Sequence, residues 1–160
     1  MAENDQAQQA PQQQFAIQAL YTKDVSFEAP MGAELFSKEW QPSFNVDLNT
    51  SSKRFNEDSY EVVLSITVTI SLGEQTAALV EVQQAGLFAI KGIEGEALRR
   101  VLGIVAPNVL FPYVRETIDS LCNRGGIPTI KLQPVNFELL YANAQQKAQQ
   151  QAGASGEAAH

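Results

Sequence analysis

The chain has very few residues of the kinds that enzymes and metalloproteins use for chemistry. It contains one cysteine, Cys122, and one histidine, His160, which is the final residue printed. A single cysteine excludes an intramolecular disulfide and fits a reducing compartment. One cysteine and one terminal histidine also cannot build a Ser-His-Asp or Cys-His catalytic set, or the four ligands of a structural zinc ion. We therefore expect no enzyme activity, no metal and no cofactor.

Basic residues are scarce as well. The 11 lysines and arginines are outnumbered by 18 aspartates and glutamates, which leaves a formal net charge of −7. Binding to nucleic acid phosphates needs a basic face, so DNA and RNA are not expected as ligands, and a basic partner is favoured. The sequence also lacks the G-x-x-x-x-G-K-[ST] loop that holds nucleotide phosphates.

Long apolar runs are missing from the chain. No uninterrupted apolar run reaches transmembrane length, and the N-terminus lacks the basic start and apolar stretch of a signal peptide. We expect a cytoplasmic protein that does not insert into a membrane. Residues 1–14 and 147–160 are rich in Gln, Ala, Gly and Glu, so they are predicted to be disordered tails around one domain at 15–146.

What the chain does contain is a long alternation of apolar and polar residues between Tyr60 and Leu72. Successive side chains of a strand point to opposite faces, so this pattern predicts a strand with one apolar and one polar face. At ~3.3 Å per residue the segment would reach roughly 40 Å, more than the diameter of a compact domain of this size, on the order of 35 Å. We therefore expect an oligomer.

The turn after this strand must contain an irregularity. Leu72-Gly73-Glu74-Gln75 reads as a tight turn into a second alternating strand that ends near Ile90. A two-residue loop would place the apolar face of one strand against the polar set of the other, because a slip of one residue reverses every side chain. The pattern therefore predicts an odd-length loop or a bulge near Gly73.

The remaining segments complete an α+β fold. Alternation predicts a strand over 15–28, with Ala19 and Tyr21 on its apolar face, and another over 40–49. Helices are predicted over 94–105 and 109–124, separated at Ala106-Pro107-Asn108 with Asn108 as N-cap, and a last helix starts after Asn136 and fades into the tail. We expect a four-stranded antiparallel sheet with helices packed on one face.

Two surfaces are candidates for binding. Strand parity puts Asp24 and Glu28 on one polar face, and Glu81 with the apolar Leu79 on the matching face of another strand. We call these four residues the acidic plate; an ordinary solvated face would have the same pattern, and both interpretations stay open. The second candidate is a groove lined by aromatic residues, for which core packing is the alternative. Its expected members are Trp40, Phe44, Phe111 and Tyr141.

Seven motifs, in order and without large gaps over 15–146, resemble the SecB family of protein-export chaperones. They are YTKDVSFEAP (21–30), KEWQP (38–42), YEVVL with SLGE (60–74), EVQQAG (81–86), GIEG (92–95), PNVLFPYVRE (107–116) and PVNFELLY (134–141).

The resemblance implies a homotetramer, a dimer of dimers, that holds unfolded precursor proteins without ATP and delivers them to the ATPase SecA. Carried over to this chain, SecA binding falls on Asp24, Glu28, Leu79 and Glu81, the acidic plate. The oligomer interface falls on Val80, Val82 and Gln84; at Val80 the family often has cysteine. The family also contacts SecA through its C-terminal tail, but AGASGEAAH at the end of this chain is too simple to match residue by residue.

Two other functions are kept as alternatives. A SecB-like chaperone of a toxin–antitoxin or stress pathway would have the same fold, and direct SecA binding would distinguish it. A small α+β-barrel enzyme is the less favoured one, and it would show an enclosed pocket with two convergent titratable groups.

Overall fold

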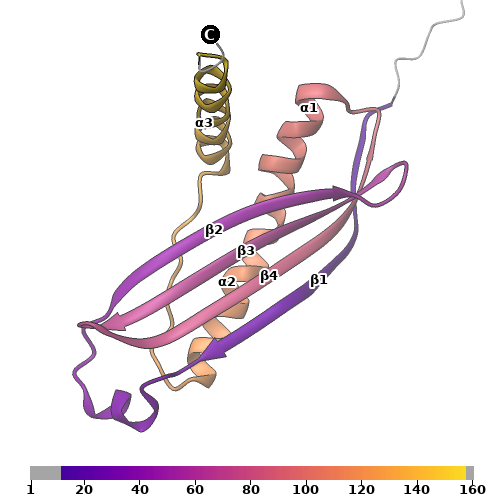
Figure 1. Cartoon of the computed structure of the whole chain (residues 1–160). Helices are drawn as coiled ribbons and strands as arrows, with labels where there is room; N and C mark the ends of the chain where they lie inside the picture. Colours follow the sequence, from indigo (N-terminus) through magenta and orange to yellow (C-terminus); the bar gives the residue numbers. More distant parts are fainter. Residues whose placement is uncertain (1–11, 158–160) are drawn as a thin grey trace, which may run out of the picture.

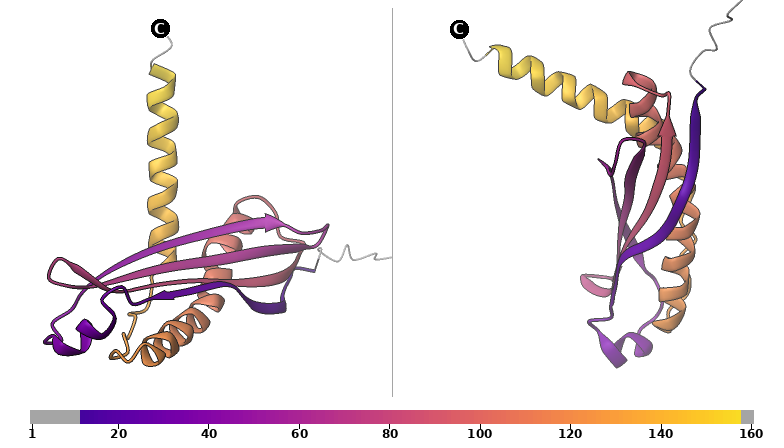
Figure 2. Two further views of the ribbon diagram at one scale, coloured as in Figure 1. Left: turned by 60° about the horizontal axis from the view of Figure 1, so that its bottom comes forward. Right: turned by 90° about the vertical axis from the view of Figure 1, so that its right-hand side faces the viewer.

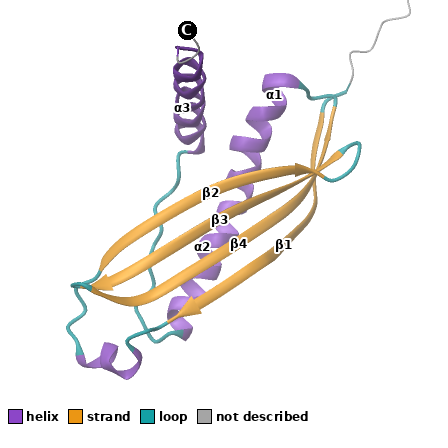
Figure 3. Ribbon diagram, in the orientation of Figure 1, coloured by secondary structure: helices purple, strands orange, loops and turns teal. Residues whose placement is uncertain are grey.

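The computed structural model describes residues 12–157, with side chains through residue 154. Four strands form one antiparallel sheet in the order β1-β4-β3-β2 (Figure 1, Figure 3). The strands are β1 (Gln14–Glu28), β2 (Ser43–Arg54), β3 (Ser59–Leu72) and β4 (Gln75–Lys91). Between β1 and β2 the chain crosses from one edge to the other through a short 3-10 helix, η1 (Gly32–Ser37). The α+β class and the antiparallel four-stranded sheet are confirmed.

The helical stretch Gly95–Arg124 lies on one side of this sheet, whereas the last helix projects toward the other side (Figure 2). After β4 come α1 (Gly95–Arg100), a π-helical segment η2 (Val101–Val105) and α2 (Ala106–Arg124), and α2 packs along β3 and β4 (Figure 2). The last helix, α3 (Phe137–Glu157), begins beside η2 and projects away from the domain (Figure 2). The opposite surface of the sheet, which we call the helix-free face, carries the odd-numbered residues of β2, β3 and the central part of β4.

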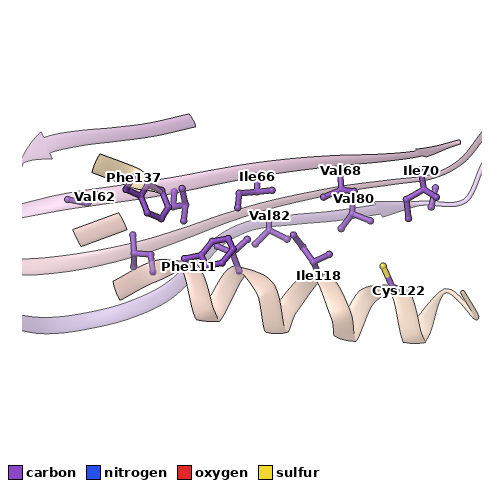
Figure 4. Packing of buried hydrophobic residues seen from close by; sticks show 14 of the residues in the cluster. Val62, Ile66, Val68, Ile70, Val80, Val82, Phe111, Ile118, Cys122 and Phe137 are labelled. Carbon is purple, nitrogen blue, oxygen red and sulfur yellow. The ribbon is translucent and has the colours of Figure 1, made fainter. Parts of the chain in front are cut away.

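The core lies between the sheet and α2 (Figure 4). Even-numbered residues of β3 and β4 point toward the helix, and every fourth or third residue of α2 points back at them, as helical periodicity requires. All of the following are buried: Val62, Leu64, Ile66, Val68, Ile70, Val80, Val82, Phe88, Leu110, Val114, Ile118 and Cys122.

The irregularity expected near Gly73 is present. Leu72 pairs with Gln75 and Ser71 with Thr76, but the next pair is Ile70 with Ala78, so Ala77 is the extra residue of a bulge. The bulge restores even-to-even pairing and brings the apolar faces of both strands to the same side. Gly73, with φ of +60°, supplies the positive φ of the tight turn.

Strand β1 does not keep one apolar face, contrary to its predicted alternation. Register shifts between Ile17 and Ala19 and between Thr22 and Asp24 reverse the orientation of the central segment. Ala19 and Tyr21 therefore lie opposite Leu87 and Ala85, on the helix-free face. Each bulge adds one residue to one strand, so two bulges reverse the side chains between them and then restore the original parity.

The predicted break between two helices at Ala106-Pro107-Asn108 is wrong. The helical path from Gly95 to Arg124 is continuous, with a widened π turn just before the proline. Pro107 has no amide hydrogen to donate, and a π turn accommodates that loss without ending the helix. Asn108 does not cap a helix, because its side-chain amide donates to the Ile104 carbonyl at 3.0 Å.

The same stretch, Gly95–Arg124, is long and apolar enough to cross a membrane by length and composition, although charged and polar residues interrupt its apolar runs. A core helix of a soluble protein meets the same criteria, and α2 does pack its apolar stripe on the sheet. Its outer side remains uncovered, and Val105 and Tyr113 are 42% and 47% exposed there.

Asn136 caps the last helix as predicted, since its side-chain oxygen accepts a hydrogen bond from the Leu139 amide at 3.0 Å. The helix does not fade near residue 146, however, and α3 continues to Glu157. Residues 147–157 were predicted to be disordered because they have little to bury. Alanine and glutamine have high helix propensity, which allows an exposed extension of a helix that is already nucleated. Of the predicted N-terminal tail, residues 1–11 lie outside the described residues.

Candidate functional site

The four residues of the acidic plate share one face of two neighbouring strands. Glu28 lies directly opposite Leu79, and the pair two residues along β4 places Ser26 opposite Glu81. Asp24 continues the same row of β1 opposite Gln83. Opposed residues of an antiparallel pair lie on the same side of the sheet. These four residues lie on the helix-free face, and the prediction that they share one face of the sheet is confirmed.

The charges of the acidic plate have no basic partner among residues 12–157. No ion pair of the described residues involves Asp24, Glu28 or Glu81, and the nearest described contact is a hydrogen bond from the Ser26 hydroxyl to Glu81 at 3.3 Å. All three carboxylates are exposed, whereas Leu79 is half-buried. An exposed array of unneutralised carboxylates around an apolar centre attracts a basic surface over long range.

Asp47 extends this acidic surface, and sequence reasoning missed it. Glu81 lies opposite Thr67 on β3, which in turn lies opposite Asp47 on β2. The row therefore carries carboxylates on two strands that are separated by β3. Parity alone assigned Asp47 to a polar face, but only the register of all four strands shows that it shares a row with Glu81.

The three residues expected at an oligomer interface are found inside the subunit. Val80 and Val82 are 0% and 1% exposed in the single chain, and Gln84 is also buried. They face α2 rather than solvent, and Val80 and Val82 belong to the core. Within the single chain these side chains are packed inside the subunit, and their part in an oligomer interface stays a prediction. Strand parity separates two faces, but it does not say which one the chain's own helix covers.

The four aromatic residues predicted to line one groove lie in different places. Phe111 is a core residue; its ring meets Phe137 edge-on at 6.2 Å, and the Arg115 guanidinium lies 4.8 Å from its centroid. Trp40 is half-buried in the crossing between β1 and β2, and Phe44 is exposed on β2. Tyr141 lines an open cavity. Phe111 points from its helix into the core, so core packing, the alternative interpretation, describes its place in the single chain, and a client contact stays a prediction.

Tyr141 belongs to a groove that we call the α3 groove, an open cavity of about 460 Å³ between the end of β2, η2 and the start of α3. Gly103 allows the close approach, since a Cβ there would lie 2.7 Å from the Tyr141 ring. Most of the walls are apolar. The apolar lining residues are Leu48, Leu102, Phe137, Leu140, Tyr141 and Ala144.

Polar contacts fasten α3 beside this groove. The Tyr141 hydroxyl donates to Glu96 at 2.9 Å, Gln145 donates to the same carboxylate at 3.2 Å, and Arg100 pairs with Glu138 at 2.7 Å. The hydrogen bond from Tyr141 is the main cause that lowers the pKa of Glu96, followed by the bond from Arg99. Glu96 therefore stays ionised and keeps accepting both bonds.

Reactive groups are sparse in the described chain. Cys122 is fully buried, and burial raises the pKa of its thiol, which keeps it protonated and unreactive. The described residues contain no group of three His, Cys, Asp or Glu side chains placed to hold a metal ion. The arrangement offers surfaces for binding polypeptides.

Comparison with known proteins identifies the family. The family model described as preprotein translocase subunit SecB matches residues 7–149. The protein-export protein SecB of Marinobacter nauticus is 48% identical over 161 aligned positions, which cover 99% of this chain and 96% of that protein.

A solved structure shares the fold. It is the Mycobacterium tuberculosis Rv1957 SecB-like chaperone in complex with a ChAD peptide from the Rv1956 HigA1 antitoxin. That chain has a TM-score of 0.60 and 16% identity, covering 76% of this chain and 91% of its own length. At this identity the likeness concerns the fold alone. With a family model that spans nearly the whole chain and a relative at 48% identity, this protein belongs to the SecB family of protein-export chaperones, which is not an enzyme family.

Proposed function

We propose that this export chaperone holds unfolded precursor proteins in the cytoplasm and delivers them to the ATPase SecA by docking its acidic plate on a basic surface of SecA. The observation that carries the proposal is the row of unneutralised carboxylates around Leu79 on a face that no helix covers. Such a surface is poorly suited to a core and well suited to electrostatic docking.

Glu81→Lys tests this docking. The substitution reverses one charge at the centre of the acidic plate, and we expect SecA affinity to fall about tenfold or more while unfolding free energy changes by about 0.5 kcal/mol or less. Glu74→Lys in the exposed β3–β4 turn is the matched control, because it makes the same charge change outside the plate. Equal affinity of SecA for the wild type and Glu81→Lys would remove the acidic plate from the mechanism.

Unfolded clients are proposed to bind the α3 groove. Its apolar walls and half-buried Tyr141 ring suit side chains that a folded protein would hide. No nucleotide is needed for such holding, since release follows when SecA engages the acidic plate. The exposed Phe44 and half-buried Trp40 remain proposed client contacts outside this groove.

Tyr141→Ala and Tyr141→Phe separate the ring from its hydroxyl. We expect the alanine variant to bind an unfolded precursor several-fold more weakly with a nearly unchanged melting temperature, because the ring provides most of the buried area. The phenylalanine variant keeps the ring and loses only the hydrogen bond to Glu96, so client binding should persist. A large loss of stability with intact client binding would assign Tyr141 to packing instead.

We also propose a homotetramer built as a dimer of dimers. The apolar outer side of the Gly95–Arg124 helical stretch supports it, because only 28% of the most apolar part of this stretch is buried within the described chain. Tyr113 and Val105 are exposed on that side, and the edge strand β1 also leaves Ile17 49% exposed. Several weak client sites on one assembly would gain avidity. Sedimentation with and without an unfolded precursor measures the assembly; a monomer at working concentration would exclude it.

A further inference from the structure

A second cavity, of about 440 Å³, opens on the helix-free face away from the acidic plate. One row of paired residues crosses all four strands there: Ala19 lies opposite Leu87, Leu87 opposite Glu61, and Glu61 opposite Lys53. The two bulges of β1 are what turn Ala19 and Tyr21 to this side. The complete lining is Ala19, Tyr21, Lys23, Lys53, Arg54, Phe55, Glu61 and Leu87, and we call this cavity the basic hollow.

The hollow is basic in an otherwise acidic chain. Its lining holds three cations and one carboxylate, Glu61, whereas the net charge of the whole chain is −7. Glu61 already accepts from Lys23 at 2.8 Å and from the Tyr21 hydroxyl. Among the described residues, Arg54 donates to the backbone carbonyls of Asn56 and Glu57, at 3.1 and 2.7 Å. Neutral carbonyls orient a guanidinium without cancelling its charge, so the hollow retains positive charge for an anion.

The walls are apolar as well as charged. Phe55 and Tyr21 are 67% and 38% exposed beside Leu87. Free inorganic anions need no such walls, whereas a carboxylate flanked by an apolar side chain uses both the cations and the rings. The hollow therefore suits an acidic and apolar element of a polypeptide.

The hollow and the acidic plate occupy one continuous surface. Leu87 in the hollow and Glu81 in the plate lie on the same side of β4, six positions apart, or roughly 20 Å at the rise of an extended strand. A protein docked on the plate would cover the hollow as well. Opposite charges at the two ends of one face also determine the orientation of such a partner.

We propose that the basic hollow receives a carboxylate flanked by an apolar side chain from the same protein that docks on the acidic plate, so that this partner is held at two points of opposite charge. The inference rests on the proposed SecA docking and specifies its second contact.

Lys53→Glu tests the proposal through the sign of its effect. If only overall charge mattered, adding negative charge would strengthen binding of a basic partner surface. If Lys53 contacts a carboxylate of SecA, the same substitution weakens binding, and we expect a loss of about fivefold. Lys131→Glu, in the loop between α2 and α3, is the matched control; Lys131 pairs with Asp119 of α2 at 3.0 Å, so the same charge change falls outside the hollow and should leave affinity nearly unchanged. Unchanged or increased affinity of Lys53→Glu would overturn the proposal.

Cross-linking identifies what occupies the hollow. The described chain has one cysteine, Cys122, and it is buried, so Lys53→Cys introduces a single accessible thiol for a photoreactive probe. We expect cross-links to a SecA segment that contains Asp or Glu beside an apolar residue. Cross-links to basic SecA segments, or to a bound client and not to SecA, would overturn the inference.

The two proposals fail in distinguishable ways. If Glu81→Lys weakens SecA binding but Lys53→Glu does not, the acidic plate stands and the hollow is not a contact. If the wild-type chain does not bind SecA at all, both proposals fail together.

Discussion

The two faces of the sheet arise from the same alternation of residues but have opposite properties: one is buried and apolar, and the other is polar and open to solvent. Under α2 the side chains of Val62, Leu64 and Ile66 are almost completely buried, and their contribution is area removed from water. On the helix-free face the neighbouring Thr67 is half-buried and Glu81 is exposed, and charge is arranged along the strands instead. One face thus supplies stability through packing, whereas the other keeps its polar groups available for partners.

This contrast predicts different responses to mutation. On the covered face a substitution changes volume or buries a polar group, so its cost appears in the free energy of unfolding. On the helix-free face a substitution changes a potential that acts on partners, so its cost appears in association.

The largest effect is expected at Val82, which is 1% exposed beneath α2. Val82→Arg would bury an unpaired cation and should cost about 3–5 kcal/mol of unfolding free energy, measured by urea denaturation. Gln83→Arg changes the adjacent residue, which points to the helix-free face, and should cost about 0.5 kcal/mol or less. Similar midpoints for the two variants would mean that the faces are assigned wrongly.

Salt should separate the two kinds of binding. Between ~0.05 and ~0.5 M salt, SecA affinity should fall strongly, because exposed charges are screened over about 10 Å at ~0.1 M. Binding of an uncharged apolar peptide in the α3 groove should change little, since burial of apolar area is its source. Titrations by fluorescence anisotropy at several salt concentrations check both. SecA binding that does not respond to salt contradicts the electrostatic role of the helix-free face.

A smaller and more local effect is expected from the titration of Tyr21 on the helix-free face. The hydrogen bond from Tyr21 to Glu61 raises the pKa of Tyr21 to about 12, with burial as the second cause. A raised pKa means that the folded state retains the proton, so this contribution is complete below about pH 10 and is lost as pH rises through about 12. Ultraviolet absorbance of tyrosinate should show a titration step near pH 12 that disappears in Tyr21→Phe.

The hydrogen bond between Tyr21 and Glu61 also makes folding stability depend on pH at low pH, with the opposite sign. Hydrogen bonds from Lys23 and then from Tyr21 lower the pKa of Glu61. Its contribution is present above its unfolded pKa of about 4.3 and is lost as pH falls through the folded value. Glu61→Gln should therefore move the Tyr21 titration back toward about pH 10. If the step that is lost in Tyr21→Phe keeps its wild-type pH in Glu61→Gln, the assignment is contradicted.

The smallest effect is expected at the start of α3, which belongs to neither face. Asn136→Ala removes the acceptor for the Leu139 amide and should cost about 1 kcal/mol of local helix stability. Circular dichroism should show a modest loss of helicity, and Asn136→Ser should retain most of it. If alanine and serine behave alike, the cap does not hold α3 in place.

Sequence reasoning succeeded where a pattern is local. Asp24 and Glu28 lie in one unbulged segment of β1, as do Leu79 and Glu81 in β4, so parity placed all four correctly on one face. The mismatch of parity at the β3–β4 turn also required the bulge that is found at Ala77. Strand parity depends only on backbone geometry between neighbouring residues, and it holds until a bulge intervenes.

Sequence reasoning failed where contacts between distant segments determine the orientation or burial of a residue. Bulges reversed Ala19 and Tyr21, and a π turn carried the helix through Pro107. Alternation also gave no indication of which face α2 would cover, so the burial of Val82 beneath α2 was not predicted.

The sequence by itself determined the strands, the four residues of the acidic plate, the cap of the last helix and, through its motifs, the family. Only the tertiary structure decided which face is buried, that Asp47 joins the row of Glu81, and that Lys53, Arg54 and Phe55 meet Ala19 and Tyr21 around the basic hollow. The physical reason is that alternation and capping are properties of adjacent residues, whereas burial and cavities depend on register between strands and on packing of segments far apart in the chain.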